Sequence, residues 1–265
     1  MDMHNEDYYT GSSVATNDEI ISTFAVIFAF TVLAALLMLF FDDLNICNNS
    51  SHNNKHIIFY VLYEFNVRPI YKAQTKDTLN ILMNGVLTVM KKHVERPAVL
   101  LLLAPSDAYY TALNLAKTIA LLILVTYGYN WTSYDLEKIF IKGSRYSAFE
   151  DYWIFHKKLL KRIQTYKVVV VDKFEAVHPQ VSTVLCNIAD DAFSPIPRSV
   201  IILIMDINNY FTQNALATKP GVNLAEIYLQ TSFGPFLDQE AITELMRIIT
   251  GRSVIIKREK DLVNI

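Results

Sequence analysis

The chain of 265 residues has little of several residue types, and each shortage excludes a class of protein. Its seven Gly and eight Pro residues are too few for a collagenous or low-complexity protein. Two Cys residues cannot build a disulfide-rich scaffold or a four-cysteine zinc site. A net charge of −2 argues against a general nucleic-acid-binding protein. What is abundant is apolar: hydrophobic residues make up 52% of the chain and charged residues only 19%, so the chain is too apolar to be disordered.

Basic residues are missing from the N-terminal part, where Lys55 is the first. All 24 Lys and Arg residues lie at or after this position, against 19 of the 26 acidic residues, which leaves a net charge of +5 on residues 55–265. Residues 1–19 are polar and acidic and show no apolar periodicity. The sequence therefore predicts a short polar tail before an ordered, slightly basic remainder.

Ile20–Phe41 is an uncharged, apolar segment between these parts. It is long enough to cross a hydrocarbon core of about 30 Å, so we expect a transmembrane helix over residues 20–41. A buried core helix and a cleaved signal peptide are the alternatives. The signal-peptide alternative fits less well because the segment lacks a basic flank and its apolar run exceeds the usual length of about 7–15 residues.

Three glycosylation sequons follow the predicted span, and they begin at Asn48, Asn49 and Asn130. Such sequons are modified only in the secretory lumen. Together they favour a single-pass type II protein. Its C-terminal domain would be lumenal, and its N-terminal tail cytosolic or nucleoplasmic.

The remainder divides into a predicted lumenal linker, residues 42–74, and a main domain, residues 75–265. Within the linker, the aromatic and β-branched residues 56–67 fit either a strand or a helix. In the main domain, short apolar runs alternate with helical patterns, which indicates an α/β domain around a mainly parallel sheet. The expected strands are 98–103, 167–172, 200–205 and 253–257; the expected helices are 73–93, 109–126, 149–165, 179–192 and 238–249; 134–141 and 223–229 fit no single type.

The first strand–loop–helix of the domain lies where a P-loop ATPase holds phosphate. That motif needs two glycines, a lysine and a serine or threonine, which supply backbone N–H groups, positive charge and an Mg²⁺ ligand. Here Ala104 and Tyr109 replace the glycines, Tyr110 replaces the lysine, and Thr111 alone is retained. The sequence therefore predicts no nucleotide at this loop.

The second strand departs from the ATPase pattern as well. A Walker B strand ends in Asp-Glu, for Mg²⁺ and for activation of water, but here Asp172 is followed by Lys173, and Glu175 comes two residues late. We expect the frame of a P-loop ATPase without a cofactor and without ATP hydrolysis of its own.

At this point the chain resembles the torsin-interacting proteins, the family of lamina-associated polypeptide one and its endoplasmic-reticulum paralogue. The resemblance covers about residues 75–265 and implies a lumenal AAA+-like domain without a nucleotide site. It also implies a protein of the endoplasmic reticulum membrane and nuclear envelope. Its most specific part is the second strand with the Lys-Phe-Glu turn and the Cys-containing helix after it. The matching stretches are Arg96–Ala104, Val168–Pro179, Ser182–Phe193 and Glu244–Thr250.

The resemblance also implies a function. Members of the family bind the ATP-bound form of torsin, a lumenal AAA+ ATPase, and place an arginine beside its nucleotide. A guanidinium is always charged and stabilises the charge that spreads over the transferred phosphoryl group. By resemblance this arginine finger lies in the C-terminal helix, where Arg247 is the candidate and Arg252 the fallback. The alternative is that Arg247 is an ordinary solvated helix residue.

Other candidate sites carry weaker signals. The six histidines show no metal-ligand spacing, so no metal site is expected. Cys47 and Cys186 would share an oxidising lumen, but free thiols are favoured, with Cys186 buried in a helix. The basic residues of 157–162 would contact acidic lipid or a partner, or form a solvated helix face.

Two other functions stay open. One is a type II membrane enzyme of the endoplasmic reticulum or Golgi that uses another site of the α/β fold. For a glycosyltransferase the expected Asp-x-Asp motif is missing, since the nearest candidates, Asp190-Asp191 and Asp206-Ile-Asn208, do not match. The other is a structural membrane adaptor without effect on torsin.

Overall fold

The computed structural model describes residues 51–91, 94–129, 136–189, 196–207 and 221–260. The predicted tail 1–19, the predicted span 20–41 and Cys47 lie outside the described residues. So do the three sequon asparagines, Asn48, Asn49 and Asn130. The described residues belong to one compact unit that begins at Ser51.

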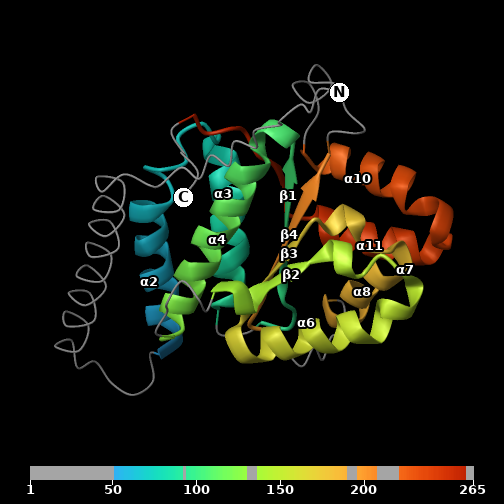
Figure 1. Cartoon of the computed structure of the whole chain (residues 1–265). Helices are drawn as coiled ribbons and strands as arrows, with labels where there is room; N and C mark the ends of the chain where they lie inside the picture. Colours follow the sequence, from blue (N-terminus) through green and yellow to red (C-terminus); the bar gives the residue numbers. More distant parts are fainter. Residues whose placement is uncertain (1–50, 92–93, 130–135, 190–195, 208–220, 261–265) are drawn as a thin grey trace, which may run out of the picture. The chain divides into compact units, whose positions relative to one another are not determined.

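A five-stranded parallel sheet forms the centre of the unit (Figure 1). Its order is β2-β3-β4-β1-β5, so the first strand of the described residues lies inside the sheet. This confirms the predicted α/β class and the parallel sheet. The strands are β1 (Ala98–Ala104), β2 (Phe140–Lys142), β3 (Val168–Asp172), β4 (Val200–Asp206) and β5 (Ser253–Ile255).

The inner strands are continuous apolar runs because both faces of the sheet are covered. Every residue of β1 is buried, and β4 is buried up to Met205. Ala98 pairs with Val200 and Ala104 with Asp206, so the two strands begin and end together. The sheet therefore has one edge of amino ends and one edge of carboxyl ends.

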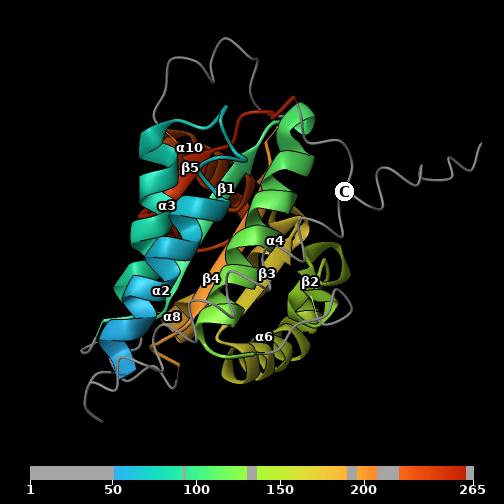
Figure 2. The same cartoon turned by 90° about the vertical axis from the view of Figure 1, so that its left-hand side faces the viewer.

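Three helices cover one face of the sheet: α2 (Ser51–Asn66), α3 (Lys76–Val89) and α4 (Tyr109–Thr126) (Figures 1 and 2). α3 and α4 contact the strands directly, and α2 packs on α3 and α4. Part of the predicted linker 42–74 therefore supplies a core helix. For residues 56–67 the helical alternative is confirmed: Phe59 and Tyr63 lie one turn apart and are fully buried, and the Tyr63 hydroxyl donates to the Leu79 carbonyl at 2.9 Å.

The second face carries α6 (Tyr152–Tyr166), α7 (Pro179–Ser182), α8 (Val184–Ala189), α10 (Gly221–Ser232) and α11 (Gln239–Thr250). The expected helix 149–165 is confirmed as α6, with a 3₁₀ turn at Phe149–Asp151 before it. The expected helix 179–192 is split at Thr183 into α7 and α8, and its end lies outside the described residues. Residues 223–229 belong to α10, and 134–141 include the 3₁₀ turn Glu137–Ile139 before β2.

Within the described part of the chain, one helix is long and apolar enough to cross a membrane by length and composition alone. It is the segment Ser106–Thr126, which includes α4. Of its most apolar window, 56% is buried inside the unit, and α4 contacts β1, β3 and β4. Its apolar character is therefore explained by its place in the core.

Candidate functional site

The carboxyl edge of the sheet is where ligands of open α/β folds usually bind. β1 is followed there by a 3₁₀ turn, Ser106–Ala108, and then by α4. The Tyr109 hydroxyl donates a hydrogen bond to Asp172 Oδ1. Burial raises the pKa of Tyr109, and the bonded Asp172 carboxylate raises it further. The two residues that the sequence comparison set against the P-loop and the Walker B strand are thus joined by a direct side-chain bond.

Acidic side chains gather at the same edge. Glu175, on the 3₁₀ turn Phe174–Ala176, accepts a hydrogen bond from the Asp206 N–H at 3.1 Å. Burial, together with Asp206 and Asp172, raises the pKa of Glu175 to about 6. Carboxylates so placed repel a phosphate group. Across the described ranges, no group of three or more His, Cys, Asp or Glu side chains is arranged to hold a metal ion.

The lysine that stands in place of the Walker B glutamate has an unusual backbone. Lys173 adopts a left-handed conformation with φ 54°, and its ammonium nitrogen lies 5.9 Å from the centroid of the Tyr109 ring. Its carbonyl oxygen approaches Gly143 so closely that a Cβ there would lie 2.2 Å from it. The turn after β3 therefore needs glycine at position 143.

Thr111, the retained P-loop residue, is buried and has a structural role. Its hydroxyl oxygen accepts a hydrogen bond from the Glu259 N–H at 3.1 Å. The Glu259 carboxylate in turn accepts from the Ala73 N–H at 2.8 Å and from Gln74 Nε2 at 2.9 Å. Thr111 thus helps to fix the segment after β5 and the loop between α2 and α3, and its hydroxyl is already used.

The amino edge of the sheet holds an open cleft of about 670 Å³ next to the first residues of β1 and β5. Three arginines line it, Arg96, Arg247 and Arg252, with Glu95 as a charged neighbour of opposite sign. We call this feature the arginine cleft. Both predicted finger residues, the candidate and its fallback, are therefore brought to one place.

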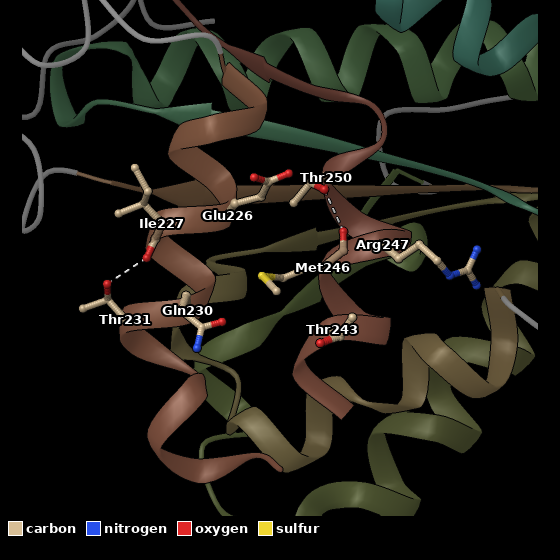
Figure 3. A pocket seen from close by; sticks show the side chains of 8 residues that line it. All are labelled: Glu226, Ile227, Gln230, Thr231, Thr243, Met246, Arg247 and Thr250. Carbon is tan, nitrogen blue, oxygen red and sulfur yellow. Dashed lines mark hydrogen bonds between the residues drawn. The ribbon is translucent and has the colours of Figure 1, made fainter. Parts of the chain in front are cut away.

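Arg247 lies on the exposed side of α11. The helix begins at Asp238, whose carboxylate accepts from the Ala241 N–H at 2.7 Å. The Arg247 guanidinium donates twice to Glu244, at 2.9 Å to Oε2 and at 2.6 Å to Oε1, and its side chain is 49% exposed. It also borders a groove of about 490 Å³ between α10 and α11, and Figure 3 shows its guanidinium extending away from the side chains of α10.

Arg252 is more buried than Arg247. It follows Gly251 at the end of α11 and packs over Gly85, where a Cβ would lie 3.0 Å from Arg252 Cδ. Its Nη2 lies 3.4 Å from Thr88 Oγ1. Burial lowers the pKa of Arg252, and no carboxylate of the described residues forms an ion pair with it. A half-buried cation with no acidic partner favours an anion as its neighbour.

Sequence reasoning missed Arg96 as a member of this cleft. A signal was present, because Arg96 comes just before the first buried strand, as Arg252 comes just before the last. In a parallel sheet, residues that precede neighbouring strands meet at the amino edge. The pairing of β1 with β5 brings these two residues together, and the sequence alone does not show that pairing.

The two cysteines and the basic helix face were also candidates. Cys186 lies on α8 and is half-buried rather than fully buried as expected, while Cys47 lies outside the described residues. On α6, Lys157 and Lys161 are exposed. Arg162 instead donates a hydrogen bond to the Phe140 carbonyl, so its side chain links α6 to β2.

Three guanidinium groups around an open cleft can bind an oxyanion through several charge-assisted hydrogen bonds. Arginine does not serve as a general base, because it stays protonated. The arrangement is therefore suited to stabilising negative charge on a group that another molecule brings. No family model and no curated protein matches the chain.

Proposed function

We propose that the protein is a membrane-anchored regulatory subunit that stimulates a torsin-type AAA+ ATPase in the lumen of the endoplasmic reticulum or nuclear envelope. In this proposal it binds the ATP-loaded partner and supplies Arg247 to the partner's nucleotide in trans. The observation that carries the proposal is the arginine cleft. There Arg247 and Arg252 lie together at an edge of the sheet remote from the chain's own degenerate phosphate loop.

The strand order supports an AAA+-like domain. β1 stands at the Walker A position and β3 at the Walker B position, and β4 lies between them. AAA+ ATPases likewise have an additional strand between their Walker A and Walker B strands. Two arginines of the cleft, Arg247 and Arg252, flank the turn from α11 into β5, at the opposite edge from the proposed Walker positions. A cation there meets a neighbouring subunit's nucleotide more readily than a nucleotide of its own chain.

The carboxyl edge supports a regulator rather than an ATPase. Tyr109 is bonded to Asp172, and Glu175 adds a carboxyl group nearby. Phosphate binding there would require this bond to break and would bring like charges together. The chain is therefore expected to act on ATP that is bound to its partner.

The Glu244–Arg247 ion pair supports an arginine finger that leaves Glu244 and binds the phosphate of the partner's ATP. An exposed ion pair contributes only about 0–1 kcal/mol, so the loss of the Glu244 contact itself costs little. Arg252 is held in place by Gly85 and Thr88 and can add fixed positive charge beside the same phosphates. In this proposal the Arg247 guanidinium moves to the partner's phosphates, whereas the Arg252 guanidinium is already in position.

The test is steady-state ATP turnover by the torsin of the same organism, with and without the full chain in nanodiscs. The variants are Arg247→Ala and Arg252→Ala. Arg258→Ala is the matched control, because Arg258 is exposed and follows β5 at the carboxyl edge. Torsin binding is measured in parallel for each variant, with ATP bound and without nucleotide.

We expect stimulation that Arg247→Ala abolishes while binding is retained, and that Arg258→Ala leaves unchanged. If Arg252→Ala abolishes stimulation and Arg247→Ala does not, the finger moves to Arg252. If the chain binds torsin equally without nucleotide and does not affect hydrolysis, it is an adaptor. If neither binding nor stimulation occurs, the torsin proposal is wrong.

A lumenal enzyme is the second candidate function. The carboxyl edge favours this candidate. There Glu175, whose pKa is raised, interacts with Asp172, and Asp172 in turn interacts with Tyr109. Perturbed titratable groups at this edge of an α/β fold are typical of active sites. In that case the Glu175→Gln variant loses turnover of a lumenal substrate, and the Arg247→Ala variant keeps it.

A further inference from the structure

The outer side of α6 and the turn before it carry large apolar side chains that the proposed function does not use. Trp153 is 72% exposed, Ile154 60% and Phe149 57%. Lys157 and Lys161 continue the same side of the helix and are exposed as well. We call these five residues the α6 patch. Contiguous exposed apolar side chains of this size usually mark a surface that contacts something else.

The helix geometry explains why this side stays uncovered. Phe155, Leu159 and Ile163 recur every four residues and are fully buried against the core. Four residues of the α6 patch, Trp153, Ile154, Lys157 and Lys161, lie on the opposite side of the helix and are exposed. Phe149 lies in the turn before the helix, where its ring is 6.3 Å from that of His178. The exposed tryptophan ring makes edge contacts with Tyr152 and His156, at centroid distances of 5.2 and 6.0 Å. Trp153 is therefore positioned at the surface by its neighbours and is not tucked into the core.

The chemistry of the α6 patch fits the interface of a lipid bilayer. Tryptophan and phenylalanine beside lysines are typical of helices that lie in the headgroup region, with lysines against anionic phosphates. Glu150 and Asp151 lie at the start of the segment, but the Asp151 carboxylate is engaged by the Ala148 N–H. The middle of the helix, with Lys157 and Lys161, is basic.

The C-terminal end of α6, the helix that carries most of the patch, lies near the end of the unit where the chain enters it. The ammonium group of Lys55, near the start of α2, lies 4.8 Å from the centroid of the Tyr127 ring, just after α4. Two residues later the Tyr129 hydroxyl donates to the Thr165 carbonyl, near the end of α6, at 2.5 Å. Figure 1 shows α6 running along the same end of the unit at which α2 begins.

The length of chain before α2 limits how far this end can be from a bilayer. This step rests on the membrane anchor of the proposed function, residues 20–41. Only residues 42–50 separate that segment from Ser51, where α2 begins. Fully extended, such a tether reaches about 30 Å. The end of the unit that includes the start of α2 is therefore held close to the membrane.

We propose that the α6 patch lies on the surface of the anchoring bilayer. Phe149, Trp153 and Ile154 enter the headgroup region, and Lys157 and Lys161 face anionic lipid phosphates. The arginine cleft borders β1 and β5, whereas α6 contacts β3. The patch and the cleft are thus separate surfaces, and the bilayer contact orients the unit while the cleft receives the partner.

The test uses the full chain in nanodiscs of phosphatidylcholine and phosphatidylglycerol at about 7:3, with bromine on the acyl chains as a quencher. Trp131→Phe makes Trp153 the sole tryptophan. The matched control adds Trp153→Phe and Tyr110→Trp, since Tyr110 is 67% exposed and lies at the carboxyl edge. We expect Trp153 emission to be quenched at least about twofold more than emission from the tryptophan introduced at position 110.

Lys157→Glu with Lys161→Glu is expected to lower this quenching and to leave torsin stimulation unchanged, which separates the inference from the proposed function. Both positions are exposed, so the thermal unfolding midpoint is the check on folding. Equal quenching at positions 153 and 110 overturns the inference. A different result is that Trp153 emission changes when torsin is added without lipid and stays unchanged with brominated lipid. That result assigns the patch to a protein contact and also overturns the inference. A chain that does not float with vesicles contradicts the anchor and the patch together.

Discussion

Tyr109 at the start of α4 and Asp172 at the end of β3 are joined by a hydrogen bond across the carboxyl edge of the sheet. In the predicted comparison with a P-loop ATPase, they correspond to the second glycine of the P-loop and to the metal-binding residue of the Walker B strand. If that comparison holds, the bond spans the space in which an ATPase holds its phosphates and Mg²⁺. It also gives the half-buried Asp172 carboxylate a donor, so it contributes to the stability of the unit.

Replacement of this tyrosine tests the contribution of the bond. Tyr109→Phe leaves Asp172 without its hydroxyl donor, and we expect the free energy of unfolding to fall by about 1–3 kcal/mol. Tyr110→Phe is the control, because Tyr110 is 67% exposed and should change the free energy by less than about 0.5 kcal/mol. Denaturant unfolding of the full chain in detergent measures both. Equal effects would show that the Tyr109–Asp172 bond contributes nothing of its own.

Glu175 predicts a pH-dependent stability. Burial raises its pKa from an ordinary value of 4.5 to about 6, so between these values the folded chain holds a proton that the unfolded chain releases. Stability from this group is therefore full below about pH 4.5 and is lost as the pH rises through 6, by up to about 2 kcal/mol. Glu175→Gln should remove this loss and stabilise the protein at pH 7 but not at pH 4.5. The test is the free energy of unfolding of the wild type and the variant at both pH values. If the variant's stability depends on pH as the wild type's does, the assignment to Glu175 is contradicted.

Two glycines predict a graded loss of stability. At Gly143 an added Cβ would lie 2.2 Å from the Lys173 carbonyl oxygen, which is backbone and cannot move aside cheaply. At Gly85 it would lie 2.4 Å from a Leu100 methyl group, which can rotate. Gly143→Ala should therefore cost more than about 3 kcal/mol, and Gly85→Ala about 1–2 kcal/mol, since alanine favours the helix. Thermal unfolding gives the order, and the reverse order would contradict the described turn after β3.

Glu244→Gln should affect activation and not stability. The Glu244–Arg247 pair is exposed, so its loss should change the free energy of unfolding by less than about 1 kcal/mol. If Arg247 must leave Glu244 to reach the partner's ATP, the variant should reach half-maximal stimulation of torsin at a concentration about two- to threefold lower. Glu240→Gln, at an exposed site on the same helix, makes the same change in charge and is the control. A higher required concentration for Glu244→Gln would mean that Glu244 orients Arg247 productively.

Much of the fold could be predicted, because β1, β3 and β4 are uninterrupted apolar runs between helical patterns. α2 was harder to predict. Its first turns are polar, and its aromatic, β-branched remainder fits a strand as well as a helix until the burial of Tyr63 shows the helical stripe. Thr183 breaks the expected helix 179–192 through a local turn that the apolar pattern does not show.

The site was predicted in part. The resemblance predicts Arg247 and Arg252 as candidate finger residues. The structure places both in the arginine cleft, and this location does not test their function. Arg96 was missed because its membership depends on which strand pairs with β1. The Tyr109–Asp172 bond was likewise beyond the sequence, since it joins residues 63 positions apart through a side-chain orientation that only packing decides.

The measurement that tests the central claim most directly is the single-turnover rate of ATP hydrolysis on torsin already loaded with ATP, because it isolates the chemical step from nucleotide exchange. An arginine finger accelerates that step by 10³–10⁵-fold in well-studied GTPases, so we expect at least about tenfold acceleration by the full chain. Arg247→Ala should return the rate to that of torsin alone. Arg247→Lys should do nearly the same, because lysine lacks the planar fork of donors. A single-turnover rate that is unchanged by the wild-type chain, or equally accelerated by Arg247→Ala and Arg252→Ala, would contradict the account.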